Sequence, residues 1–90
     1  MKKLSGTDTQ RMIQLFENEL NMIHGVSVIE KMQYRRKIMN VLMPALAVND
    51  VKVEAVISAV EQRLGDVLRI FQDGDGFKEK LRRELDSKLR

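Results

Sequence analysis

Apolar residues recur every three or four positions along almost the whole chain, which is the period of an amphipathic α-helix. Helix-capping and helix-breaking residues divide this pattern into four segments. We predict helices over residues 7–24, 27–43, 49–72 and 76–90. The sequence therefore predicts an all-α fold, a small three- to four-helix bundle in one domain (1–90). The first two helices are expected to form an antiparallel hairpin that packs on a long third helix.

Local signals support the first two helices. Thr7 and Ser27 each precede a Gln or Glu by three residues, which is the spacing of a capping box, so both are expected to begin helices. Gly25 lies between them and can adopt the positive φ that often follows a helix end. Pro44 cannot donate a backbone hydrogen bond, so the second helix is expected to end or kink there.

The third segment leaves alternatives open. Asn49 or Asp50 is expected to cap a helix that continues to about residue 72. Gly65 lies on the apolar face of this helix and lowers helix stability by about 1 kcal/mol relative to Ala. A break in the helix at Gly65 is therefore one alternative. The alternation of Val51 and Val53, in a stretch rich in β-branched residues, leaves a strand as the other.

The methionines are concentrated in the first half of the chain, and two of them join Val28 and Ile29 in the apolar pattern of the second helix. Methionine-rich faces can serve as adaptable binding surfaces. We favour the simpler interpretation that most of them fill the core. The group consists of Met12, Met22, Met32, Met39 and Met43.

The composition gives little support for catalysis. The chain has no cysteine and a single histidine, His24, which has no nucleophile or orienting acid near it in the sequence. A zinc site normally needs several nitrogen or sulfur ligands. We therefore predict a protein that is not an enzyme, with no catalytic, cofactor-binding or metal-ligating residues. The segment Asp73–Gly76 resembles the centre of a calcium loop, but Phe71 and Arg82 stand where its terminal ligands belong, so we interpret it as a turn.

The size of the chain favours association. A single domain of 90 residues is only marginally stable alone, and without cysteine it cannot form disulfides. We therefore expect a homodimer or a docked protein partner. No apolar run is long enough to span a membrane, and polar residues after Met1 interrupt any secretion signal. The expected compartment is the cytoplasm, or the host-cell interior if the protein is viral.

The C-terminal helix combines an apolar stripe with most of the excess charge. Residues 77–90 carry six Lys and Arg against three Asp and Glu, and the net charge of the whole chain is +3. The stripe can fill a partner groove, the basic residues can contact phosphates, or the helix can simply be solvated. The predicted partner-binding face consists of Phe77, Leu81, Leu85 and Leu89.

Basic residues also interrupt the second helix. The candidates for contact with nucleic acid are Arg35, Arg36, Lys37, Lys78, Arg82 and Arg83. Glu19 and Arg35 fall within the apolar arcs of the first two helices. They are expected to pair across the hairpin, to reach its edge, or to face a partner.

These features predict a small interaction protein: a regulator, inhibitor, adaptor or assembly factor that presents an amphipathic helical face. The alternative is a nucleic-acid-binding regulator that uses the basic C-terminal helix.

Overall fold

The computed structural model describes residues 3–90, and all regular secondary structure in that range is helical. The predicted all-α class is confirmed, and the strand alternative near Val51 is not found in this range. The helices are α1 (Gly6–Asn21), α2 (Val28–Leu46), α3 (Val53–Arg63), α4 (Gly65–Ile70) and α5 (Gly74–Lys88).

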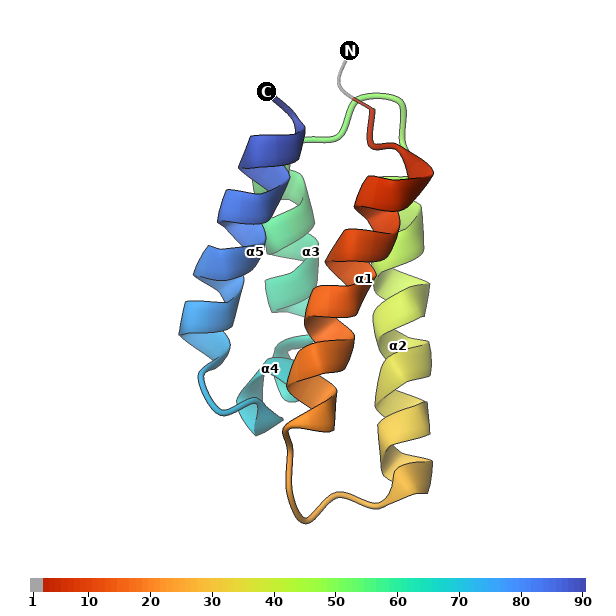
Figure 1. The fold of residues 1–90 in the computed structure, drawn as a ribbon, viewed down its shortest axis with the longest axis vertical. Helices are drawn as coiled ribbons and strands as arrows, with labels where there is room; N and C mark the ends of the chain where they lie inside the picture. Colours follow the sequence, from red (N-terminus) through yellow and green to blue (C-terminus); the bar gives the residue numbers. More distant parts are fainter. Residues whose placement is uncertain (1–2) are drawn as a thin grey trace.

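Four of these helices form a closed ring (Figure 1). Helix α1 packs against α2 and α5, and α3 packs against the same two helices from the other side. Helices α1 and α2 run antiparallel and are joined by the loop around Gly25, whose φ is +81°. The short helix α4 lies at one end of the ring and packs on α3 and α5.

The three phenylalanines of the chain meet in the core. Phe16 of α1 lies 4.6 Å from Phe77 of α5 and 6.2 Å from Phe71, measured between ring centroids, and Phe71 lies 5.1 Å from Phe77. All three rings are buried. Full burial of such a side chain contributes roughly 1.5–3 kcal/mol, so this cluster is a main link between the α1 and α5 halves of the ring.

The residue that caps α2 is the predicted one, whereas the residue that caps α1 is not. The Ser27 hydroxyl accepts a hydrogen bond from the Glu30 N–H at 3.1 Å, as predicted. Helix α1 begins earlier than expected, because Ser5 rather than Thr7 caps it by accepting a bond from the Asp8 N–H at 3.1 Å. Both residues have a hydroxyl that can cap, so the local signal did not distinguish them.

Helix α2 continues through Pro44 to Leu46, so the predicted end at residue 43 is wrong. Pro44 is exposed, whereas Leu46 in the next turn is buried. Burial of Leu46, together with the hydrogen bond from the Ala47 N–H to the Met43 carbonyl (3.0 Å), holds the last turn in place. The bond that proline cannot donate would go to the carbonyl of Asn40, which is at the surface where water can replace it.

The single helix expected over residues 49–72 is wrong, and the alternative of a break near Gly65 is found, because two shorter helices replace it. Leu64 leaves helical geometry with φ −119° and ψ 20°, and α4 begins at the next residue, Gly65. The break turns α4 toward the end of the ring, where Val67 and Phe71 are buried. A straight helix would carry these side chains past the core.

The start of α3 differs from the prediction as well. The helix begins at Val53 after Lys52, which makes no side-chain capping bond, and neither Asn49 nor Asp50 caps it. The intervening segment buries Val51, which is 3% exposed. Burial of this side chain delays the helix by two residues relative to a cap at Asp50.

Helix α5 begins at Gly74, two residues earlier than predicted. Asp73 and Gly74 together account for this start. The Asp73 carboxylate caps the helix by accepting a hydrogen bond from the Gly76 N–H at 3.0 Å. A Cβ atom on Gly74 would lie 2.6 Å from the carbonyl oxygen of Leu68, so only glycine lets α5 begin this close to α4. The link between α4 and α5 is therefore confined to residues 71–73, and the prediction that Asp73–Gly76 is a turn is wrong for its last three residues, which form the start of α5.

Candidate functional site

The apolar face of the C-terminal helix is not at the surface. Phe77, Leu81 and Leu85 are 3%, 0% and 0% exposed, and Leu89 packs partly buried against the same core. Helices α1, α3 and α4 of the same chain pack against α5. The prediction that this face receives a partner is therefore corrected: the chain fills it with its own core.

Four of the six basic residues proposed for phosphate contact are paired with carboxylates of the same chain. The pairs are Arg35–Glu17 at 3.4 Å, Lys37–Asp66 at 2.6 Å, Lys78–Glu61 at 3.5 Å, Lys78–Asp75 at 3.4 Å, Arg82–Glu54 at 3.3 Å and Arg82–Glu79 at 2.9 Å. Arg36 and Arg83 are exposed and form no ion pair within residues 3–90. They lie on α2 and α5, at diagonal corners of the ring (Figure 1), so the six residues form no single basic patch.

The ion pair expected between the first two helices involves a different carboxylate. Arg35 pairs with Glu17 instead of Glu19. Two residues along a helix are separated by about 200° around its axis, so only one of these carboxylates can face Arg35. The side chains of Arg35 and Glu17 are 45% and 31% exposed, and such a pair contributes at most about 1 kcal/mol.

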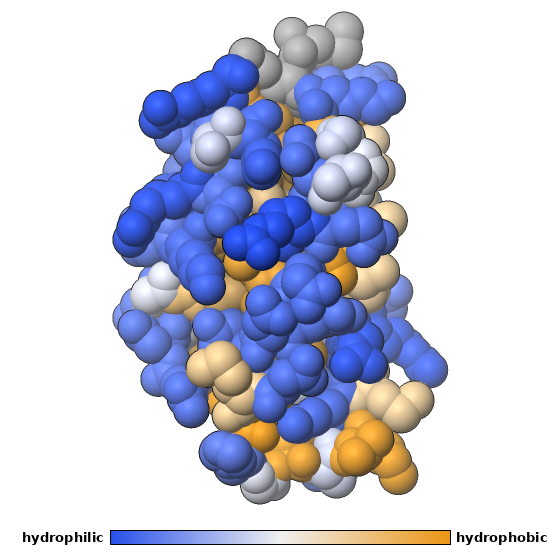
Figure 2. Space-filling view, viewed as in Figure 1, coloured by the Kyte–Doolittle hydropathy of each residue, from blue (hydrophilic) through white to orange (hydrophobic). Residues whose placement is uncertain are grey.

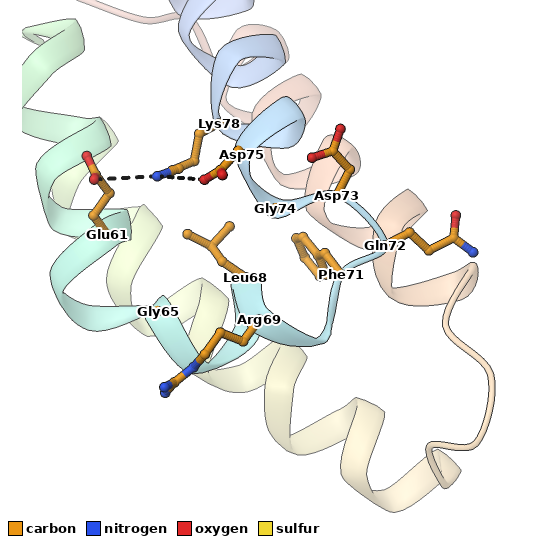
Figure 3. Close-up of a pocket in the computed structure, with 10 residues that line it drawn as sticks. All are labelled: Glu61, Gly65, Leu68, Arg69, Phe71, Gln72, Asp73, Gly74, Asp75 and Lys78. Atoms are coloured by element: carbon orange, nitrogen blue, oxygen red, sulfur yellow. Dashed lines mark ion pairs between the residues drawn. The ribbon is translucent and has the colours of Figure 1, made fainter.

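A surface cavity of about 460 Å³ lies where α3, α4 and α5 meet (Figure 3). Lys78 lies between Glu61 and Asp75 at one side of it. The hydrogen bond to Asp75 and the charge of Glu61 raise the pKa of Lys78, although desolvation opposes them. Lys78 therefore stays protonated at neutral pH, where an ammonium group is neither a nucleophile nor a base.

The other residues suited to acid–base or metal chemistry do not gather. His24 is exposed in the loop between α1 and α2, and it does not line the cavity. Across the described part of the chain, no three His, Cys, Asp or Glu side chains come together in a group that could hold a metal ion.

The exposed large apolar side chains gather around one helix, α2. They are Met22 (47%), Val28 (75%), Ile29 (69%), Met32 (55%), Met43 (39%) and Val48 (46%). Four of them lie on α2, Val48 lies two residues after its end, and Met22 lies at the end of α1. Figure 2 shows hydrophobic surface at the end of the molecule where α2 begins, with paler patches along the α2 edge.

Val28, Met32, Met39 and Met43 form a stripe along α2, which we call the outer stripe. At about 100° per residue, these side chains span an arc of about 60° around the helix axis. Ile38, in the middle of the core-facing side, points about 110° away from the centre of this arc. Met39 is half-buried and the other three are exposed, so the stripe continues outward from the edge of the core.

The interpretation that most of the methionines fill the core is wrong, because Met22, Met32 and Met43 are exposed. The apolar pattern of α2 also indicated this surface. Val28, Ile29 and Met32 were assigned to the same apolar face as the core residues. The combined apolar arc of α2, from Val41 to Ile29, is about 240° wide, whereas a helix packed on one face needs an arc of about 100°. The excess width indicates a second face.

No protein-family model, curated protein or solved structure matches the chain. Within residues 3–90, none of the helices has both the length and the hydrophobicity that crossing a membrane requires.

Proposed function

We propose that the protein is a small non-enzymatic interaction protein (a regulator, inhibitor, adaptor or assembly factor) whose docking face is the outer stripe of α2. The supporting observation is that four of the six exposed large apolar side chains lie on α2. Single exposed apolar residues are normal at protein surfaces, whereas a contiguous group marks an interaction site. The proposal keeps the predicted class of function and moves the face from α5 to α2.

The stripe combines a rigid support with adaptable side chains. The neighbouring side of α2 is held in the core by Ile38 and Leu42, which are 1% and 0% exposed. Lys37 also ties α2 to Asp66 of α4 through a 2.6 Å ion pair. Methionine is unbranched and polarisable, so it adjusts to the shape of a partner on a helix whose backbone is already ordered.

A photo-crosslinking amino acid at position 32, introduced in the cells that contain the protein, tests this proposal. The matched control carries the same group at Gln62, which is exposed on α3. We expect a discrete protein adduct from position 32, no matching adduct from position 62, and a weaker adduct when Val28→Lys is added. Equal labelling from both positions, or none from position 32, contradicts the proposal.

The alternative, a nucleic-acid-binding regulator, is supported by the net charge of +3 and by the unpaired Arg36 and Arg83. Binding through phosphates falls steeply with salt. A mobility-shift titration at low and high salt tests this alternative. Affinity that is unmeasurable at low salt contradicts it.

A further inference from the structure

We propose that the outer side of α5 binds a phosphate group through Lys80, Arg83 and Ser87. Together with Glu84, these residues line a surface hollow of about 270 Å³. The hollow lies on a different helix from the outer stripe of α2, so this inference does not depend on the proposed docking face. It shares Arg83 with the nucleic-acid alternative, and it adds a defined site and a ligand chemistry.

The basic residues in the hollow differ from the others near the C-terminus because they are unpaired. Lys80 and Arg83 form no ion pair within residues 3–90, and Ser87 has no hydrogen-bond partner there. The other four basic residues after Phe77 each engage a carboxylate. These pairs are Lys78–Asp75, Arg82–Glu79, Lys88–Asp8 and Arg90–Asp86. The hollow therefore gathers two positive charges and one hydroxyl group that have no acceptor of their own.

The period of the helix brings these side chains to one side of α5. Positions 80, 83, 84 and 87 fall within an arc of about 100° around the helix axis. The centre of this arc lies about 110° from Leu81, which is buried in the middle of the core-facing side. Because the core holds the backbone of α5 in place, the donors share one side before a ligand arrives.

Glu84 lines the hollow, but its charge is offset from another helix. A Glu four residues from a Lys on a helix can pair with it, so Glu84 could neutralise Lys80. In the structure the Glu84 Oε1 atom instead lies 3.3 Å from the guanidinium of Arg11 on α1. Three cations and one carboxylate therefore surround the hollow, and the positive excess attracts an anion.

The donors match a phosphate group better than a carboxylate. A terminal phosphate presents three oxygens, so Lys80, Arg83 and Ser87 can each donate to a different one. A carboxylate has two oxygens and leaves one of the three donors without an acceptor of its own. At about 30 Å³ per water molecule, the hollow holds several waters that a phosphate group can replace.

The exposure of the donors limits the affinity. Lys80, Arg83 and Ser87 are all exposed, so water and salt screen each contact with the ligand. We therefore expect inorganic phosphate to bind with a dissociation constant in the millimolar range. A phosphate group that is part of a larger ligand gains affinity from further contacts of that ligand.

An NMR titration with inorganic phosphate, at an ionic strength held constant with sodium chloride, tests the site. We expect saturable shifts of the backbone amide signals of residues 80–87. Lys80→Gln and Arg83→Gln should each weaken binding about two- to fivefold, because each removes one exposed charge contact. Both positions are exposed, so the variants should keep the fold, which circular dichroism checks.

Arg36→Gln is the matched control. It removes an exposed and unpaired cation from α2 that does not line the hollow, so it should leave the affinity for phosphate unchanged. Absence of saturable shifts at residues 80–87 overturns the inference. Equal weakening by Arg36→Gln also overturns it, because the net charge of the chain would then explain the binding.

A second titration, with a short oligothymidylate, distinguishes two sources of the phosphate group. Tighter binding than inorganic phosphate, weakened by Lys80→Gln and Arg83→Gln, assigns the site to a nucleic-acid backbone. Binding of inorganic phosphate with no added affinity for the oligonucleotide assigns it to a small phosphorylated ligand. The photo-adduct from position 32 is independent of both titrations, so failure of this site leaves the α2 proposal in place.

Discussion

Helices α2 and α5 are both amphipathic, but they use their apolar residues differently. Helix α5 has one narrow stripe with four-residue spacing, and Phe77, Leu81 and Leu85 in it are buried. Helix α2 has two neighbouring apolar arcs, and only one of them faces the core. The width of the apolar arc therefore indicates which helix leaves apolar side chains exposed, whereas the presence of a regular stripe does not.

The ring explains why the two helices differ. Helix α5 packs against α1, α3 and α4, and Phe71 after α4 contacts Phe77 in its first turn. Helix α2 packs mainly against α1 and α3, and its first turns extend toward the hairpin loop, on the side away from α5 (Figure 1). Where three helices surround α5, a narrow apolar stripe is enough to fill the contact with them. Where only two helices pack against α2, part of its wider apolar arc stays exposed.

The largest expected difference is between a side chain in the α5 stripe and one in the α2 outer stripe. Leu81→Ala should lower the free energy of unfolding by about 2–5 kcal/mol, because Leu81 is 0% exposed and its removal leaves a cavity. Met32→Ala should change it by no more than about 0.5 kcal/mol. Urea unfolding followed by circular dichroism at low protein concentration measures both values. Similar losses for the two variants would show that the outer stripe belongs to the core.

The next largest effect concerns the close contact between Gly74 of α5 and Leu68 of α4. Gly74→Ala should destabilise the protein by about 1–3 kcal/mol, because its Cβ would lie 2.6 Å from the Leu68 carbonyl oxygen. Gly65→Ala is the matched control: it lies in a helix and has no atom within 4 Å of its Cβ position. It should be neutral or stabilise by up to about 1 kcal/mol. Thermal unfolding distinguishes the two, and equal melting temperatures would contradict the close approach of α5 to α4.

The smallest effect concerns the ion pair that ties α2 to α4. The hydrogen bond from Lys37 is the main cause that lowers the pKa of Asp66, while desolvation opposes it. A carboxyl group with a lowered pKa in the folded state stabilises the protein above its ordinary pKa, and this contribution is lost as the pH falls through the folded value. Lys37→Ala should therefore destabilise by less than about 1 kcal/mol near neutral pH, since both side chains are more than 40% exposed.

The contribution of this ion pair to stability is measured by urea unfolding. Lys37→Ala and the parent chain are compared at neutral and at strongly acidic pH. The difference in stability should disappear in acid, where Asp66 is protonated in both states. A difference that persists unchanged in acid would assign the effect of Lys37 to packing of its side chain instead of to the ion pair.

Features that depend on neighbouring residues in the chain were predictable. Ser27 caps α2, and Gly25 adopts a positive φ in the loop between α1 and α2, although α1 already ends at Asn21. Predictions failed where distant packing outweighed a local preference. Pro44 does not end α2 because Leu46 beyond it is buried, and the third helix breaks at Leu64 because the break brings Phe71 to the other two phenylalanines.

The sequence by itself determined the helical class and the absence of cysteine chemistry. It also determined the wide apolar arc of α2. Only the tertiary structure decided which part of that arc faces the core, that the α5 stripe is buried, and that Arg35 pairs with Glu17. The physical reason is that the period of a helix specifies where each side chain points around its own axis. The rotation of that axis relative to its neighbours depends on how all the helices pack together.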